Sequence, residues 1–110
     1  MKLTNSEKAV IEPRKLTGYC LNQNHADGQH KARVFKAALD LDVDNVEELK
    51  AALLNAVKSY DAIPDKANQY GQKYIIDFSM NRGNKTAIIH SVWIVRNSDK
   101  LPHLVTCYVL

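Results

Sequence analysis

The spacing of the apolar residues changes once along the chain, near residue 70, and this change restricts the possible folds more than any other feature of the sequence. Before it, apolar side chains recur three and four residues apart, which places them on one face of a helix. After it, apolar and polar side chains alternate, as in a strand with one buried face. Helices followed by strands predict an α+β domain, with N-terminal helices packed on one face of a C-terminal antiparallel sheet of three to four strands.

Two helices and one shorter helical turn are expected in the first half. The turn covers about residues 14–21, and the first long helix covers about residues 28–39, where Asp27 stands at the position of a capping carboxylate. The polar stretch 42–45 breaks the pattern and supplies a second cap. A second helix then continues to about Ser59, with its apolar residues at Val46, Leu49, Leu53, Ala56 and Val57.

Three strands are expected in the second half. Residues 61–72 contain proline, glycine and amides without either period, which predicts a connector. Strands are expected at 74–80, at 85–96 and at 103–110, with a hairpin turn at 81–84. The segment 85–96 is apolar on both faces, which is typical of a central strand.

The length of 110 residues and the apolar content of 45% are those of one ordinary domain. Residues 1–8 are polar and are expected to be a flexible N-terminus, and residues 9–110 are expected to form the single domain. The 15 basic and 12 acidic residues leave a formal charge of +3, and the basic residues are scattered along the chain. Such an excess permits contact with a polyanion but does not predict it.

The cysteines and the N-terminus bear on the cellular compartment. Cys20 and Cys107 lie far apart without C-x-x-C spacing, so we expect two free thiols in a reducing environment. The N-terminus has no apolar core of signal-peptide length, and no segment approaches the roughly 20 apolar residues of a membrane span. The sequence therefore predicts a cytoplasmic protein without a membrane partner, although export by a route without a classical signal stays open.

The most suggestive polar residues flank the start of the first long helix. His25 carries an imidazole, which can act as a general acid or base, and the ammonium of Lys31 could stabilise an oxyanion or a phosphate. The alternative is that His25 is an exposed or capping histidine and Lys31 a solvated helix residue. His25, Asp27 and His30 match no strong zinc template, so neither a metal nor a cofactor is expected.

Two residues in the predicted strands could join this site. Thr106 lies in the last strand and His90 in the central one. Because antiparallel pairing brings these strands side by side, either side chain could face the first helix. The alternative is that Thr106 is a packing residue and His90 a structural histidine.

Further positions could contact a substrate. Gly28 would let a phosphate approach the free amides at the helix N-terminus. Trp93 could stack on a base, although an aromatic residue in a strand is more often part of the core. The predicted substrate-binding set consists of Asn22, Gly28, His90 and Trp93.

These residues belong to a longer pattern, L-N-x-x-H-x-x-G-x-x-K-A-x-x-F, which resembles the signature of a small uncharacterised bacterial domain family. The pattern is formed here by Leu21, Asn22, His25, Gly28, Lys31, Ala32 and Phe35. Members of that family occur alone and as C-terminal modules of larger adhesin-like or toxin-like proteins. The end of the chain is similar too, through Trp93, Ile94, Pro102, Leu104, Val105, Thr106 and Tyr108. The resemblance covers about residues 9–110.

The order of helices and strands also resembles the barnase, EndoU, colicin and RelE group of metal-independent ribonuclease toxins. This resemblance implies that His25 takes the proton from a ribose 2′-hydroxyl, that Lys31 balances charge on the phosphate, and that Thr106 holds a phosphate oxygen. The product would be a cyclic phosphate. A toxin of this kind would have RNA as its substrate and a small neighbouring protein as its inhibitor.

Two hypotheses for the function follow. The first is a ribonuclease-like, toxin-type domain with the catalytic residues His25, Lys31 and Thr106. The second is a non-catalytic protein-interaction module whose polar turn contacts a partner. They differ in a spatial requirement, because catalysis needs those three side chains to converge on one small group of substrate atoms.

Overall fold

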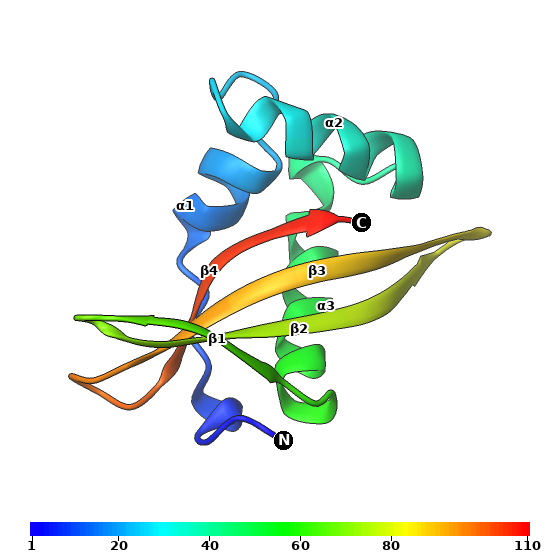
Figure 1. Cartoon of the computed structure of the whole chain (residues 1–110). Coiled ribbons are helices and arrows are strands. Elements are labelled where there is room, and N and C mark those ends of the chain that lie inside the picture. The colour runs from blue at the N-terminus through cyan, green and yellow to red at the C-terminus, as the bar shows by residue number, and fades with distance from the viewer.

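Figure 1 shows the computed structural model, which describes all 110 residues. Helical segments come first, and a four-stranded antiparallel sheet with the order β1-β2-β3-β4 completes the chain. The helical segments are η1 (Ser6–Lys8), α1 (Pro13–Lys15), η2 (Leu16–Cys20), α2 (Gly28–Leu39), η3 (Val43–Asn45) and α3 (Val46–Ser59). The strands are β1 (Ile63–Asn68), β2 (Gly71–Arg82), β3 (Lys85–Arg96) and β4 (Pro102–Val109). This is the α+β architecture that the sequence predicts.

The two long helices, α2 and α3, begin and end where the sequence predicts, and the helical turn before them is formed by α1 and η2. Asp42 supplies the predicted cap at the turn that leads into α3. Its carboxylate accepts a hydrogen bond from the backbone N–H of Asp44 at 3.0 Å, and its own N–H donates to the Asn45 side chain at 3.1 Å. No helix in the structure is both long enough and apolar enough to cross a bilayer.

The prediction of a connector over residues 61–72 is wrong, because β1 and the start of β2 occupy it. All six residues of β1 are exposed, so this edge strand has no buried face that could produce an alternating pattern. Pro64 also argued against a strand, yet an edge strand is where a sheet tolerates proline. The pairing with β2 is irregular between Pro64 and Ala67.

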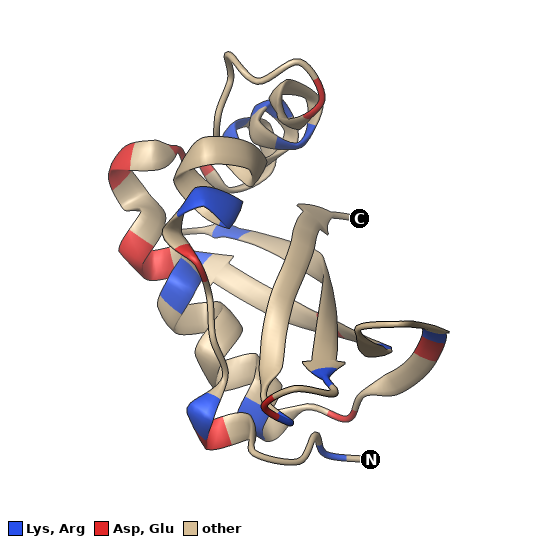
Figure 2. Cartoon of the chain, turned by 90° about the vertical axis from the view of Figure 1, so that its left-hand side faces the viewer, with Lys and Arg blue, Asp and Glu red and all other residues tan.

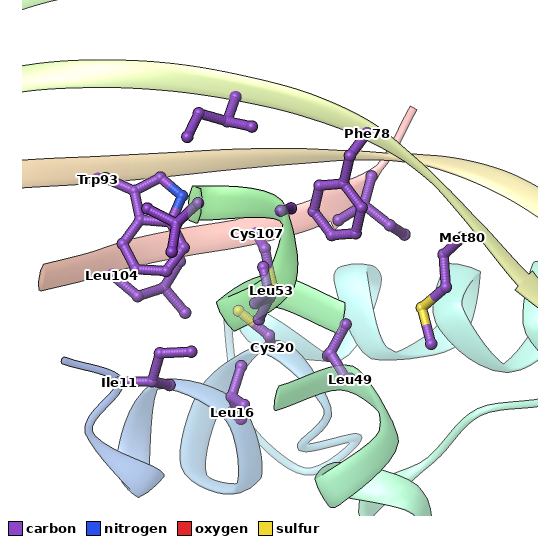
Figure 3. Packing of buried hydrophobic residues seen from close by; sticks show 14 of the residues in the cluster. Ile11, Leu16, Cys20, Leu49, Leu53, Phe78, Met80, Trp93, Leu104 and Cys107 are labelled. Atoms are coloured by element: carbon purple, nitrogen blue, oxygen red, sulfur yellow. The ribbon is translucent and has the colours of Figure 1, made fainter. Parts of the chain in front are cut away.

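The helices lie on one side of the sheet (Figure 2), and the hydrophobic core lies between them and that face (Figure 3). On β3, the alternate residues Ile89, Ser91 and Trp93 point to this face and are 0% exposed. Ser91 Oγ donates to the carbonyl of Ile76 at 2.6 Å and accepts from Trp93 Nε1 at 3.0 Å, so the buried polar atoms of both side chains are paired. The opposite face, called the outer face below, is turned toward the viewer in Figure 1, and no helix lies over it.

The N-terminal residues 1–8, which the sequence predicts to be flexible, contact the domain. Leu3 is part of the core with 4% exposure, and the carbonyl of Met1 accepts a hydrogen bond from the N–H of Ala62 at 2.7 Å. After η1, Val10 forms a parallel bridge with His103 on β4. The outer edge of β4 is therefore partly covered near its start.

A bulge in β4 decides which of its side chains reach the helices. Val92 on β3 pairs with Thr106 and the next residue, Trp93, pairs with Leu104, so Val105 has no partner in the register. The extra residue lets Leu104 and Cys107 both join the core, although positions three apart in a regular strand point to opposite faces. Thr106 lies beside Cys107 at the border between the core and the helical segments.

Candidate functional site

The candidate site lies where η2 and the start of α2 meet β4 (Figure 1). Gly28 brings these helical segments together. A Cβ atom added to it would lie 2.1 Å from the carbonyl oxygen of Tyr19, a distance that no side chain can accept. The backbone of α2 therefore starts in direct contact with η2, and side chains from both segments lie within reach of the last strand.

His25 caps α2, the alternative that the sequence left open for it. Its Nδ1 accepts hydrogen bonds from the backbone N–H groups of Asp27 at 3.0 Å and Gly28 at 2.9 Å. The predicted cap by the Asp27 carboxylate is wrong, because that side chain makes no capping hydrogen bond. A nitrogen that accepts two hydrogen bonds carries no hydrogen, so a neutral His25 ring carries its hydrogen on Nε2. In this state the ring can donate a hydrogen bond but cannot accept a proton at Nε2.

Lys31 is the cation of the site. Its Nζ lies 2.6 Å from the Tyr19 hydroxyl and 3.2 Å from Thr106 Oγ1. The same ammonium lies 4.3 Å from the centre of the Tyr19 ring and 5.7 Å from that of Tyr108. Lys31 is partly buried, and none of the ion pairs in the structure involves it. A partly buried ammonium held by hydroxyls and aromatic rings, without a carboxylate, is suited to an anionic ligand.

The three predicted catalytic residues thus belong to one chain of contacts, which runs through Tyr19. The His25 ring meets the Tyr19 ring edge-on, with 4.9 Å between the ring centres. The Tyr19 hydroxyl meets Lys31, which in turn meets Thr106. Sequence reasoning placed Tyr19 only within the helical turn 14–21 and missed its hydroxyl. The only signal in the sequence was its proximity to the polar turn.

Two free thiols, those of Cys20 and Cys107, lie in the hydrophobic core (Figure 3). Cys20 Sγ lies 3.7 Å from Thr106 Oγ1. A hydrogen bond from the Cys107 thiol lowers the pKa of Cys20, and Thr106 and the positive charge of Lys31 act in the same direction. The same hydrogen bond, together with burial, raises the pKa of Cys107. Both residues are 0% exposed, so they support Thr106 from within the core and do not meet solvent.

His90 lies on the outer face of the sheet, directly opposite Asp77 on β2 and Tyr108 on β4. Its Nδ1 lies 2.7 Å from Asp77 Oδ1, and its side chain is 16% exposed. The His90 ring also packs on the Tyr108 ring, with 4.8 Å between the centres. Because Tyr108 contacts Lys31 as well, His90 is connected to the site through this tyrosine.

The other predicted substrate-binding residues take different positions. Trp93 is fully buried and bonded to Ser91, so it is a core residue and does not reach the site. Asn22 shapes the polar turn, where its Oδ1 accepts from the N–H of Asn24 at 2.9 Å. Gly28 is buried against Tyr19, and its N–H is bonded to His25. No group of three or more His, Cys, Asp and Glu side chains lies close enough together to hold a metal ion.

Two shallow hollows flank these residues at the surface. One has a volume of about 390 Å³ and is lined by Arg14, Lys15, Gly18, Tyr19, His25 and Val105. The other has a volume of about 270 Å³ and is lined by His30, Lys31, Val34, Tyr108 and Val109. Basic side chains border both hollows and neither is lined by a carboxylate, so the surface around the site favours an anion.

Comparison with the models of known protein families identifies the family of this chain. The model of a domain of unknown function, DUF6883, matches residues 2–110. The chain belongs to the DUF6883 family. No curated protein matches its sequence. Its fold is similar to that of a chain in the solved structure of a contact-dependent growth inhibition toxin–immunity protein complex from Klebsiella pneumoniae 342. The TM-score is 0.71 and the identity 16%, and the alignment covers 92% of this DUF6883 chain and 99% of the other.

Proposed function

We propose that this DUF6883 domain is a metal-independent ribonuclease of the toxin type, which cleaves RNA through attack of a ribose 2′-hydroxyl on the adjacent phosphate. The observation that carries the proposal is the partly buried Lys31 ammonium, which lies 3.2 Å from Thr106 Oγ1 and has no carboxylate partner. A phosphodiester would supply the missing negative charge. The ammonium and the hydroxyl would then contact the phosphate oxygens on which charge develops in the transition state.

Each residue has a role that its surroundings allow. Lys31 balances the charge of the phosphate, and Thr106 donates from its hydroxyl to a phosphate oxygen. His25 presents Nε2–H as a further hydrogen-bond donor, since its Nδ1 holds the start of α2. Tyr19 keeps Lys31 and His25 in place through contacts with both. This assignment differs from the role of proton acceptor that the resemblance implied for His25.

The bonds that change are those of ordinary RNA transesterification. The 2′-oxygen forms a bond to phosphorus and its proton passes to a base. The bond between phosphorus and the 5′-oxygen breaks, and the 5′-oxygen leaves with the electron pair and takes a proton from water. The products are a 2′,3′-cyclic phosphate and a 5′-hydroxyl. None of these bond changes requires a metal or a redox cofactor.

The fold of a chain in a toxin–immunity protein complex supports a toxin-related role, which in this proposal includes a small protein partner that acts as an inhibitor. Such a partner would neutralise the domain by covering Lys31 and the hollows beside it. The two reduced thiols, Cys20 and Cys107, agree with action in the cytoplasm, where thiols stay reduced.

The test compares RNA cleavage by purified variants in the presence of EDTA. Lys31→Ala is expected to lower kcat at least about 100-fold, as the loss of one transition-state contact does in other enzymes. Thr106→Val, which preserves the side-chain shape, is expected to lower it as well. Arg33→Ala is the matched control, because it removes a positive charge from the same helix at an exposed position away from the site. Equal rates for Lys31→Ala and Arg33→Ala would contradict the proposal.

The second candidate function is a non-catalytic protein-interaction module. The hydrogen bonds of His25 favour it, since they give the Nδ1 of this histidine a structural task at the start of α2. Under this alternative no RNA is cleaved by the wild-type protein, and exposed residues of the polar turn contribute to the affinity for a protein partner. The cleavage assay therefore separates the two candidates.

A further inference from the structure

We propose that His90, held by Asp77, is the general base that removes the proton of the attacking 2′-hydroxyl. This inference rests on the proposed function and completes it, because neither Lys31 nor Thr106 accepts a proton in that scheme and the Nδ1 of His25 is occupied. None of these three side chains can therefore serve as the general base. His90 is connected to Lys31 through a shared aromatic contact with Tyr108, as His25 is through Tyr19, and no backbone N–H group is bonded to its ring.

The His90–Asp77 pair fixes the ring in the state that a base requires. Nδ1 lies 2.7 Å from the Asp77 carboxylate, so this nitrogen carries the hydrogen and donates it. In the neutral ring, Nε2 then has a free lone pair. The side chain is 16% exposed and stands on the uncovered outer face, so the lone pair is not enclosed by the core. When Nε2 takes a proton, the nearby carboxylate stabilises the resulting imidazolium. His25 has the reverse arrangement, with Nδ1 as acceptor.

Tyr108 connects this pair to the phosphate-binding residues. It stands opposite His90 on the neighbouring strand, with 4.8 Å between the two ring centres, and the Lys31 ammonium lies 5.7 Å from its ring. Tyr108 is partly exposed and lines the 270 Å³ hollow together with Lys31. A nucleotide whose phosphate meets Lys31 would place its ribose over Tyr108, on the side of the sheet where His90 stands. The proton of the 2′-hydroxyl passes to His90 Nε2, and the bond changes are those given above.

A second histidine–aspartate pair in the same chain provides a matched comparison. His103 Nε2 lies 2.8 Å from Asp99 Oδ2, but its side chain is only 10% exposed and its Nδ1 is buried without a hydrogen-bond partner. His103 lies near the start of β4, where Val10 covers the edge of the strand. It forms the same kind of pair without access to a substrate, so its replacement tests for the general effect of losing a His–Asp pair.

The first measurement does not depend on activity. Long-range ¹H–¹⁵N correlation spectra of the full chain at pH 8 report which ring nitrogen carries the hydrogen. We expect His90 to carry it on Nδ1 and His25 to carry it on Nε2. A His90 ring with its hydrogen on Nε2 would overturn the assignment of the base, whatever the fate of the proposed ribonuclease activity.

The second measurement is the rate of RNA cleavage in EDTA by wild type, Lys31→Ala, His90→Ala and His103→Gln. His90→Ala is expected to lower kcat at least about 100-fold. Added imidazole is expected to restore part of the rate, a rescue that a structural role would not show. His103→Gln is expected to keep kcat within a few fold. A far-UV circular dichroism spectrum and an unfolding midpoint show whether each variant folds, and His90→Gln replaces His90→Ala if the latter does not.

Asp77 acts as a positioning residue for His90, and this role has a test of its own. The titratable or charged side chains that contact the His90 ring or the Tyr108 ring beside it are Asp77, Tyr108 and Lys31, from β2, β4 and α2. Asp77→Asn replaces a carboxylate, which only accepts hydrogen bonds, with an amide that can also donate one, so the fraction of His90 rings with the hydrogen on Nδ1 is expected to fall, together with kcat. An unchanged tautomer and rate in Asp77→Asn would overturn its positioning role.

The outcomes separate this inference from the proposed function. Loss of activity in Lys31→Ala together with near wild-type activity in His90→Ala would overturn the base and leave the ribonuclease intact. Absence of RNA cleavage by the wild type would overturn both. Loss of activity in both variants, with imidazole rescue confined to His90→Ala, is the result that we expect.

Discussion

The contact between Gly28 and Tyr19 predicts that Gly28→Ala destabilises the protein and distorts the site. The added Cβ would lie 2.1 Å from the Tyr19 carbonyl oxygen, 2.9 Å from its carbon and 3.0 Å from Cδ1 of the ring. Cβ atoms essentially never come closer than 3.0 Å to another heavy atom, so the two segments must separate by about 0.9 Å. The φ angle of Gly28 is not in the left-handed region, so the cost is steric.

The size of the effect follows from what cannot move. The added Cβ is fixed to the backbone at the start of α2 and meets the backbone of Tyr19 in η2. A side-chain rotation therefore does not relieve the clash. Overpacking of this kind costs about 1–3 kcal/mol, and we expect the upper half of that range. For a domain of this size, a loss of about 2–3 kcal/mol lowers Tm by about 8–12 °C.

Thermal unfolding by circular dichroism measures the effect, and Gly18→Ala is the matched control. Gly18 lies in η2, and the nearest atom to its added Cβ would be Arg14 Cβ at 3.6 Å, an ordinary contact. This variant is expected to gain up to about 0.5–1 kcal/mol, because alanine loses less backbone entropy on folding. A Gly28→Ala variant within about 0.5 kcal/mol of wild type, or a Gly18→Ala variant with the larger loss, would refute the packing argument.

Three more predictions concern the core, the response to acid and the site. Ser91→Ala leaves the buried Trp93 N–H without its acceptor and is expected to cost about 2 kcal/mol, measured by urea unfolding. A backbone hydrogen bond and then a lysine ammonium lower the pKa of Asp42, so the ionised carboxylate stabilises the fold above about pH 4, the pKa of the unfolded state. This stabilisation is lost as the pH falls below that value. Urea unfolding midpoints at pH 3 and pH 6 measure the loss, and the difference between them is expected to be smaller for Asp42→Asn than for wild type. Tyr19→Phe keeps the ring but removes the hydroxyl from Lys31, and is expected to lower RNA cleavage about tenfold, less than Lys31→Ala does.

The periodic parts of the sequence predicted most of the fold. α2 and α3 each bury one face, so their residue spacing carried enough information to place both helices, and β3 was placed from its apolar character. β1 was missed because all its residues are exposed and its pairing depends on β2 alone. Local spacing cannot reveal a strand that buries no side chains.

The sequence indicated which residues could belong to the candidate site better than it indicated their chemical roles. Lys31 and Thr106 are 75 positions apart, and the expectation that they meet needed only the pairing of strands and helices. The roles of His25 and His90 depend on which ring nitrogen carries the hydrogen. For His25 this is set by the backbone N–H groups at the start of α2, and for His90 by the carboxylate of Asp77 on the neighbouring strand. The bulge at Val105, which places Thr106 beside the core, has no signature in the residue types.

The central claim is that Lys31 and its neighbours bind a phosphate of RNA while the adjacent ribose attacks it. The most direct measurement is the reaction of the wild-type protein in EDTA with an RNA oligonucleotide and with the same sequence bearing 2′-deoxyriboses, followed by mass spectrometry of the products. We predict cleavage of the RNA alone, to fragments that end in a 2′,3′-cyclic phosphate and a 5′-hydroxyl. Cleavage of the 2′-deoxy oligonucleotide, products without the cyclic phosphate, or an intact RNA would contradict the claim.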